Sequence, residues 1–167
     1  MSRFRPRPPA CTAAVNDGRP GTVATSLVAQ VQAGVAQFGA DKKLKGLVLD
    51  LRFARGQDYA AAAALAGQFL PPEKARLDVG GVMLAAAAQA NPVNLPMAVL
   101  INHETAGAGE ALAALLRQNK AALLLGGTTA GEAFAYKEFP LSNGARLHIA
   151  TSSVKLGDGQ LVPAQGV

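Results

Sequence analysis

Short apolar segments alternate with helical segments in the middle of the chain, and this alternation limits the possible folds more than any other feature. The segments 45–52, 97–102 and 120–126 are rich in Leu and Val and have the length of buried strands. Segments 58–72 and 107–119 lie between them and read as helices. We therefore expect an α/β domain with a largely parallel sheet and covering helices. We also expect the strand at 45–52 to be covered on both faces, as strands of parallel sheets usually are.

The N-terminal part of the chain divides into an arm and a helix. Residues 1–21 are rich in Pro, Gly and Arg, which predicts an extended or mobile segment. From residue 22 onward apolar side chains recur every four positions, and Gly39 provides a stop, so we expect a helix over 22–38. The chain is therefore expected to consist of a flexible basic arm, 1–21, and one domain, 22–167.

Turn signals mark the C-terminal part of the chain. Ser-Asn-Gly at 142–144 and Gly-Asp-Gly at 157–159 are typical of turns. The sequence between them alternates polar and apolar residues, as a strand does. A hairpin or β meander should therefore close the domain. We interpret segment 76–84 as one further strand.

The positive charge of the chain does not indicate nucleic-acid binding. The formal net charge is +5. The arm accounts for +3 of it, because four arginines stand against Asp17 alone. The other charges are of both signs, interspersed, and form no basic face with aromatic residues among them. We expect no nucleic-acid partner.

Metal, disulfide and membrane chemistry are not indicated either. Cys11 is the only cysteine, so the chain forms no internal disulfide and no thiolate metal cluster. His103 and His148 lack the close spacing of a zinc helix motif. The sequence has no apolar run of about 18 residues, which a membrane span requires, and no apolar core of a signal peptide. We expect no metal, no cofactor and no membrane span.

The segment HETAGAGEALAALL, residues 103–116, is the main candidate for a site. Small residues precede a helix, and an acidic residue stands in what would be its first turn. Two interpretations are open. The small residues could serve only to let the helix start approach a neighbouring strand, or they could mark a nucleophile position that has lost its side chain.

Three separated segments together resemble the C-terminal processing, or tail-specific, protease family. GLVLDLRFARG at 46–56 resembles its strand and Gly-bearing turn. The segment 96–132 resembles its nucleophile strand, helix and following strand, and 139–167 its closing meander. The resemblance covers roughly residues 22–167. It implies the ββα-type core of the ClpP and crotonase superfamily, with a C-terminal β meander.

The resemblance also implies positions for the catalytic residues. In this family a serine attacks the peptide carbonyl, a neutral lysine takes its proton, and two backbone N–H groups hold the oxyanion. The family motif Ser-Ala-Ser-Ala-Ser-Glu corresponds here to residues 105–110, which puts Gly107 at the nucleophile position. Glu132 stands at the position of the lysine, and Tyr136 at that of the glutamine that orients it. All three positions depart from the family.

The scaffold around these positions is retained. Glu110 keeps its place in the first helical turn, where the helix dipole favours an anion. Gly56 and Ala108 match the two backbone donors of the oxyanion, although the family's Asn-Pro-Gly-Gly turn is Ala-Arg-Gly-Gln at 54–57. The PDZ-like module that such proteases carry is not found in this sequence.

These observations predict a degenerate, non-catalytic tail-specific-protease-like domain. Its vestigial cleft is expected to hold a peptide or a protein C-terminal tail by main-chain hydrogen bonds, or the domain serves in assembly. By resemblance to the family, the protein is expected to work outside the cytoplasm. The residues assigned to the cleft are Gly56, Thr105, Gly107, Ala108, Glu132 and Tyr136.

Two enzymatic alternatives stay open at this point. A crotonase-like enzyme would use the oxyanion donors with Glu132 or Glu104 as acid and base. An active peptidase would use Thr105, or Ser153 together with Lys155, as relocated catalytic residues. Simpler roles are expected for the other polar residues: a structural pair of Asp50 and Arg52, a strand-end His103 and a solvent-facing His148.

Overall fold

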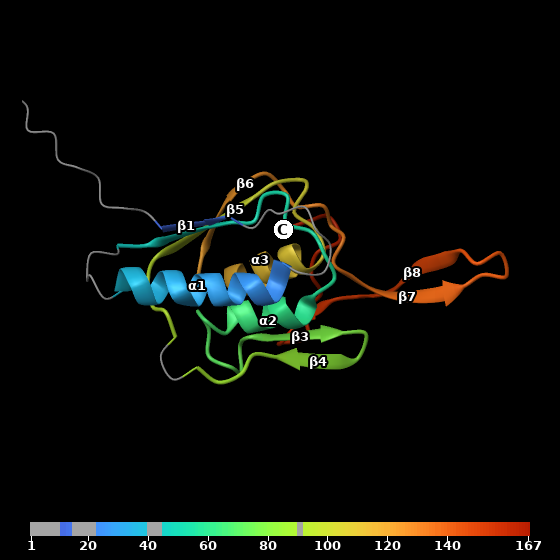
Figure 1. Ribbon diagram of the computed structural model, residues 1–167, viewed down its shortest axis with the longest axis horizontal. Helices are drawn as coiled ribbons and strands as arrows, with labels where there is room; N and C mark the ends of the chain where they lie inside the picture. The colour runs from blue at the N-terminus through green and yellow to red at the C-terminus, as the bar shows by residue number, and fades with distance from the viewer. Residues whose placement is uncertain (1–10, 15–22, 40–44, 90–91) are drawn as a thin grey trace, which may run out of the picture.

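A computed structural model describes residues 11–14, 23–39, 45–89 and 92–167, and it has three layers (Figure 1). The first layer is a four-stranded sheet, the middle layer holds three helices, and the third layer is a smaller sheet. The expected α/β class with a largely parallel sheet is confirmed. None of the helices in the described ranges is long and apolar enough to cross a membrane.

The large sheet has the strand order β1-β2-β5-β6, and every pair in it is parallel. Its strands are β1 (Cys11–Ala14), β2 (Leu47–Asp50), β5 (Met97–Ile101) and β6 (Leu123–Gly126). The last three match the predicted apolar segments. Strand β1 lies within the predicted arm, and the rest of that arm falls outside the described residues.

The helices are α1 (Val23–Gly39), α2 (Tyr59–Ala66) and α3 (Ala108–Gln118). Asp58 caps α2, because its Oδ1 accepts a hydrogen bond of 2.9 Å from the amide of Ala61. The alanines of α2 and α3 carry little side-chain volume, so these helices pack closely against each other. Leu65 and Leu115 are almost completely buried between the layers.

Among the described residues, helices cover one face of the large sheet, so the second cover predicted for 45–52 is not found there (Figure 1). Leu49 and Val99 point to the helices and are buried. The outer face carries the alternate residues of β2, β5 and β6; Asp50, paired with Arg52, is charged and the others are apolar. In the described part of the chain no helix lies on this face (Figure 1). Its apolar side chains are Val48, Ala98, Leu100, Leu123 and Leu125.

The small sheet contains β3 (Arg76–Val79), β4 (Val82–Ala85) and β9 (Lys155–Leu156), in the order β4-β3-β9. The segment predicted as one strand is thus a hairpin. Its turn is Gly80-Gly81, both with positive φ, the backbone conformation that two-residue hairpin turns need.

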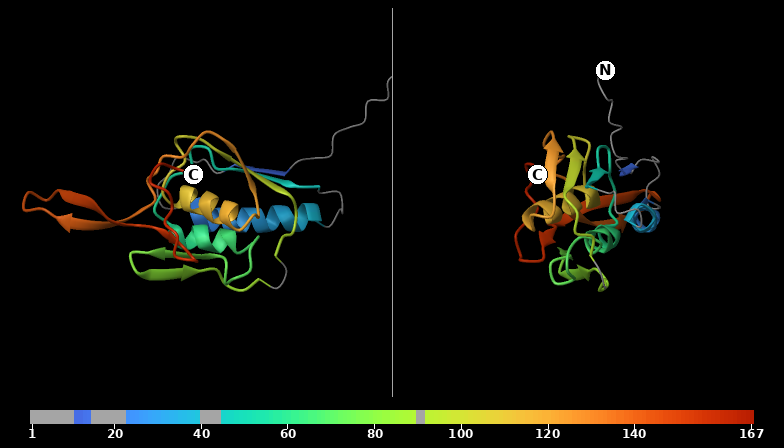
Figure 2. Two further views of the ribbon diagram at one scale, coloured as in Figure 1. Left: turned by 180° about the vertical axis from the view of Figure 1, so that it is seen from behind. Right: turned by 90° about the vertical axis from the view of Figure 1, so that its left-hand side faces the viewer.

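The predicted hairpin near the C-terminus is present and long. Strands β7 (Phe134–Pro140) and β8 (Arg146–Ser153) pair antiparallel, with a bulge between Ala135 and Tyr136. The hairpin extends away from the layered body in both side views (Figures 1 and 2). From here on, "the arm" means this hairpin, residues 134–153, and not the N-terminal segment 1–21.

Candidate functional site

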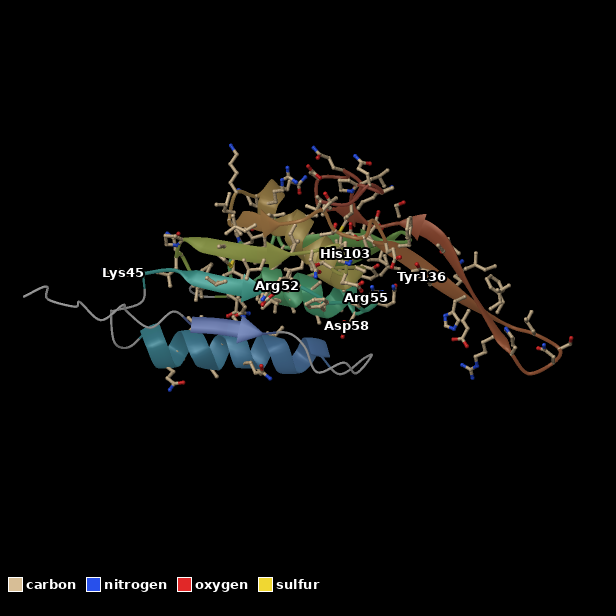
Figure 3. All side chains as sticks on the ribbon, turned by 90° about the horizontal axis from the view of Figure 1, so that it is seen from above. Lys45, Arg52, Arg55, Asp58, His103 and Tyr136 are labelled. Carbon is tan, nitrogen blue, oxygen red and sulfur yellow. The ribbon has the colours of Figure 1, made fainter. Side chains whose placement is uncertain are left out.

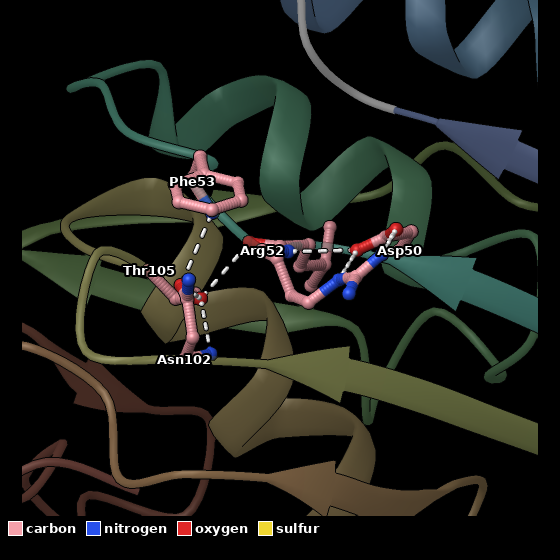
Figure 4. A network of polar contacts seen from close by, with 6 residues as sticks. Asp50, Arg52, Phe53, Asn102 and Thr105 are labelled. Carbon is pink, nitrogen blue, oxygen red and sulfur yellow. Dashed lines mark hydrogen bonds and ion pairs between the residues drawn. The ribbon is translucent and has the colours of Figure 1, made fainter.

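The carboxyl ends of β2 and β5 are joined by hydrogen bonds that centre on Asn102 and Thr105 (Figure 4). The Asn102 Oδ1 accepts from the amides of Phe53, at 3.2 Å, and Glu104, at 3.1 Å. The buried Thr105 hydroxyl donates to the Leu51 carbonyl at 2.9 Å and accepts from the Asn102 amide at 3.1 Å. The two loops that follow these strands are therefore held side by side.

Two ion pairs flank this junction. Asp50 and Arg52 pair as expected, with 2.7 Å between Oδ2 and Nη2, and the hydrogen bonds from Arg52 lower the pKa of the Asp50 carboxyl. The Arg55 guanidinium pairs with Glu104 and so ties the loop after β2 to the loop after β5. His103 is largely exposed beside Glu104, with 3.4 Å between Nε2 and Oε1 (Figure 3).

Gly107 stands at the N-cap of α3 with φ 58° and ψ −122°. The residues on either side of it bind the loop after β2: the amide of Ala106 donates to the Ala54 carbonyl at 2.9 Å, and that of Ala108 donates to the Gly56 carbonyl at 2.8 Å. The helix start and the Gly-bearing turn therefore meet, as the resemblance implied. The group that Gly56 directs at the helix start is, however, its carbonyl oxygen.

Residue 107 has no space for a side chain in this arrangement. A Cβ atom placed on Gly107 would overlap the carbonyl oxygen of Gly56. Because that oxygen belongs to the main chain, it can move only if the turn at 54–57 moves with it. Glycine is therefore required here both by its positive φ and by the packing of the turn.

Glu110 is completely buried in the first turn of α3 and holds the loop that follows β6. Its carboxylate accepts from the Thr129 hydroxyl at 2.6 Å and from the amides of Gly131 and Glu132 at 3.0 and 2.8 Å. Thr129 Oγ1 in turn accepts from the amide of Val167 at 2.7 Å. This carboxylate thus binds main chain and a hydroxyl, and both of its oxygens accept hydrogen bonds.

The remaining residues of the predicted cleft lie on either side of this loop. The main chain of Glu132 is fixed by Glu110, while its side chain is exposed. The Tyr136 ring lies at the base of the arm, edge-on to Phe134 with 6.5 Å between ring centres. Among the six predicted residues, the structure brings Gly56, Gly107 and Ala108 into direct contact.

A groove of about 830 Å³ opens beside this region, between the β3–β4 turn and the base of the arm. Gln57 connects it to the turn described above, and Tyr136 is the member of the predicted cleft that lines it. Its charged walls come from Asp78, Lys137, Glu138 and Lys155, and Ser152 and Ser153 add hydroxyl groups. In the described residues, no group of His, Cys, Asp and Glu side chains is placed to hold a metal ion.

Tyr59 also lines this groove, and sequence reasoning did not identify it. Its hydroxyl donates to the Phe134 carbonyl at 2.8 Å, which anchors the arm to α2. Burial is the main cause that raises the pKa of this phenol far above 10, and the charges of Tyr136 and Glu110 raise it further. A tyrosine beside an alanine run carries no local signal for such a role.

We expect Tyr59→Phe to change the alkaline stability of the protein. In wild type the folded state keeps the phenol protonated, while the unfolded chain ionises near pH 10, so the free energy of unfolding should fall as pH rises above about 10. At neutral pH the free energy of unfolding of the variant should be about 1 kcal/mol lower, because the hydrogen bond to the Phe134 carbonyl is lost. Above about pH 10 its free energy of unfolding should fall less steeply than that of wild type. Urea unfolding at several pH values measures both. Equal alkaline slopes for the two proteins would contradict the assignment.

Comparison with known proteins identifies the family. The model of peptidase family S41 matches residues 23–167, so the chain belongs to peptidase family S41. The carboxy-terminal processing protease CtpA of Bacillus subtilis (strain 168) is 27% identical over 130 residues, which are 75% of this chain and 28% of that protein. The resemblance to C-terminal processing proteases is thereby confirmed.

Solved structures of the family share the fold. The photosystem II D1 C-terminal processing protease superposes with a TM-score of 0.69 and 23% identity, over 84% of this chain and 37% of its own. A putative S41 protease from Bacteroides fragilis NCTC 9343 gives a TM-score of 0.66 and 21% identity, over 90% of this chain and 43% of its own. The chain thus spans about a third of the length of these relatives.

Proposed function

We propose that this domain is a non-hydrolytic member of peptidase family S41 that binds extended peptide segments. The observation that carries this proposal is the contact at the start of α3. By the resemblance, Gly107 stands at the position of the family's serine. The neighbouring amide of Ala108 already donates to a main-chain carbonyl. An acyl-transfer site needs both an attacking group and free oxyanion donors.

The contacts of the alternative nucleophiles also argue against hydrolysis. The Thr105 hydroxyl is buried and donates to the Leu51 carbonyl, so a base cannot reach its proton. Ser153 and Lys155 line the open groove, yet Val154 between them points into the core, and the lysine is exposed. The lysine of a Ser–Lys pair is activated in a buried, apolar setting, and Lys155 does not have one.

The crotonase-like alternative lacks a free oxyanion donor. Its enolate would need the Ala108 amide, which the Gly56 carbonyl occupies. Glu104, one of its two acid–base candidates, is paired with Arg55. Glu132 lies in a solvated loop, with its main chain fixed by Glu110. Binding without chemistry is the function that these contacts support.

The groove supplies the binding surface for this proposal. It is open, carries charges of both signs, and is walled by two antiparallel hairpins whose main chains suit an extended ligand. Two of the relatives, CtpA and the photosystem II D1 protease, are named for C-terminal processing. We therefore propose unstructured protein tails as the ligand class.

The test for hydrolysis uses a fluorophosphonate probe and unstructured fluorescent peptides with the 167-residue chain. We expect neither covalent labelling nor cleavage. Labelling that disappears in Ser153→Ala or Thr105→Ala would overturn the non-hydrolytic part of the proposal. Turnover of acyl thioesters that is lost in Glu132→Gln would instead establish the crotonase-like alternative.

The test for binding uses fluorescence anisotropy with the same peptides. Val82 and Met83 are neighbours on β4 and both are exposed, but only Val82 is among the residues that line the groove. We expect saturable binding that Val82→Arg weakens about tenfold or more, a loss of about 1.4 kcal/mol or more, and that Met83→Arg leaves unchanged. Equal effects of the two variants would contradict the placement of the peptide in the groove.

A further inference from the structure

The hydrogen bonds at the two ends of the arm show which main-chain groups of β7 point away from β8. At the tip, the amide of Leu141 donates to the carbonyl of Ala145 at 2.8 Å. At the base, the amide of Val154 donates to the carbonyl of Ala133 at 3.0 Å. Along an antiparallel pair, residues that bond to the partner strand alternate with residues whose N–H and C=O groups point outward. The odd-numbered residues of β7 therefore bond to β8, and its even-numbered residues face the outer edge.

Two features of β7 support this alternation. The carbonyl of Phe134, an even-numbered residue, accepts a hydrogen bond of 2.8 Å from the Tyr59 hydroxyl. Pro140 is even-numbered as well, and proline in a sheet occupies edge positions where its missing N–H would face away from the partner strand. The bulge leaves Thr151 of β8 without a partner, so it does not interrupt the alternation along β7.

Tyr136 and Glu138 are thus the residues of β7 whose N–H and C=O groups both point outward. Neither main chain has a partner at this edge among the described residues. The unpaired stretch is limited at both ends, because the Phe134 carbonyl is already bound and Pro140 has no N–H to donate. The residues between these limits, 135–139, offer two donors and two acceptors to a further strand.

The groove follows this outer edge of β7. The consecutive residues 135–138 all line it, whereas a groove on one face of a strand would be lined by alternate residues. Tyr59, which bonds to the outward carbonyl of Phe134, lines the groove as well. Tyr136 and Glu138 are both exposed. Their unpaired main-chain groups are therefore accessible from the groove.

We propose that an extended peptide segment adds to the outer edge of β7 as a third strand, bound by the N–H and C=O groups of Tyr136 and Glu138. This inference rests on the proposed function and specifies the strand, the register and the class of ligand. Main-chain hydrogen bonds of this kind give strand addition its affinity. A two-stranded hairpin is marginally stable in water, and a third strand is what independent stability requires. Binding should therefore also stabilise the arm.

The main-chain bonds define the segments that fit this edge. A segment must cover residues 135–139 and present N–H groups at alternate positions, so proline-free extended segments bind and proline-rich segments do not. Because these bonds do not involve side chains, the sequence of the segment is otherwise weakly restricted. The ligand class is thus unstructured segments that can adopt a β conformation.

The first test is amide hydrogen exchange of the wild-type chain with and without a fluorescent, proline-free peptide rich in Thr and Ser. In the free protein we expect faster exchange at Tyr136 and Glu138 than at Lys137 and Phe139, whose amides bond to β8. Saturating peptide should slow exchange at Tyr136 and Glu138 at least about tenfold. Exchange at Ala150, whose amide faces the other edge of the arm, should not change.

Proline variants test the same groups by fluorescence anisotropy with this peptide. Glu138→Pro removes one outward N–H, and Glu138→Ala keeps it, so the proline variant should bind about tenfold or more weakly than the alanine variant. Ala150→Pro is the matched control, because it removes an N–H at the opposite edge of the arm, and it should bind as wild type does. Circular dichroism checks that the variants fold, and the exchange experiment needs no variant.

The outcomes separate this inference from the proposed function. If the peptide binds saturably but Tyr136 and Glu138 gain no protection, or if Glu138→Pro and Glu138→Ala bind alike, the edge assignment is wrong while peptide binding stands. Equal binding of a peptide with a Pro-Pro pair at its centre would overturn the ligand class. If the peptide does not bind at all, the proposed function fails, and this inference fails with it.

Discussion

Gly107→Ala should remove about 2 to 5 kcal/mol from the free energy of unfolding, a large part of the stability of a domain this size. The new Cβ would overlap the carbonyl oxygen of Gly56, and alanine would also be forced into a backbone conformation that only glycine adopts readily. Relief requires the turn at 54–57 to move and to break its hydrogen bonds to Ala106 and Ala108. Urea unfolding followed by circular dichroism measures the loss.

Gly81→Ala is the matched control for this experiment. Gly81 has a φ of 88°, but a Cβ there would meet no atom within 4 Å. Its substitution should therefore cost only the backbone strain, about 1 to 2 kcal/mol. The difference between the two variants reports the steric contact at residue 107 together with the different backbone conformations of the two glycines. If both variants were equally stable, the turn at 54–57 would have to be free to move.

This contact also bears on any attempt to restore hydrolysis. A serine introduced at residue 107, even together with a lysine at residue 132, would meet the same carbonyl oxygen as alanine does. The turn would have to open before the hydroxyl could take its place and before the Ala108 amide became free. A hydroxyl at residue 107 therefore requires a displaced turn at 54–57 at the same time.

Glu110→Ala should cost about 3 to 5 kcal/mol. The substitution leaves the Thr129 hydroxyl and the amides of Gly131 and Glu132 without their acceptor inside the protein. The loop after β6 is then expected to open, and with it the attachment of Val167 to Thr129. The free energy of unfolding gives the total loss, and hydrogen exchange at the amides of Gly131 and Glu132 shows where it arises.

Glu110→Gln separates shape from charge in this network. Glutamine has the same size but offers a single oxygen acceptor, and its NH₂ group would face one of the three donors. An intermediate loss of stability is expected, with faster exchange at one of the two amides. Should Glu110→Ala unfold at the same urea concentration as wild type, water would have to satisfy these donors, and the network would have little energetic weight.

The sequence allowed the architecture to be predicted where local pattern decides it. The apolar runs at 47–50, 97–101 and 123–126 and the helices between them followed from length and composition. The same pattern could not show what covers the outer face of the sheet. A strand such as Leu47–Asp50 reads as apolar on both sides whether its second cover is a helix of its own chain or a surface of another.

The candidate site was predictable in position but not in its contacts. The spacing of small residues before α3 placed Gly107 and Ala108 correctly at a helix start. That the Gly56 carbonyl would occupy the Ala108 amide depends on the path of a turn that lies about 50 residues earlier in the chain. Asn102, which joins the two loops, could have been suspected from an amide directly after a buried strand. Tyr59 offered no such signal.

The small sheet has a consequence for how the chain is made. Leu77 pairs with Leu156, so β3 lacks one neighbour until residue 156 has emerged from the ribosome. The parallel pairs of the large sheet likewise join segments far apart in the sequence. Contacts of such long sequence separation form slowly, because a long loop must close before they contribute. Nascent chains should therefore keep leucine-rich strands unpaired for an extended time, which makes chaperone capture during synthesis and losses to inclusion bodies during rapid overexpression expected features of this protein.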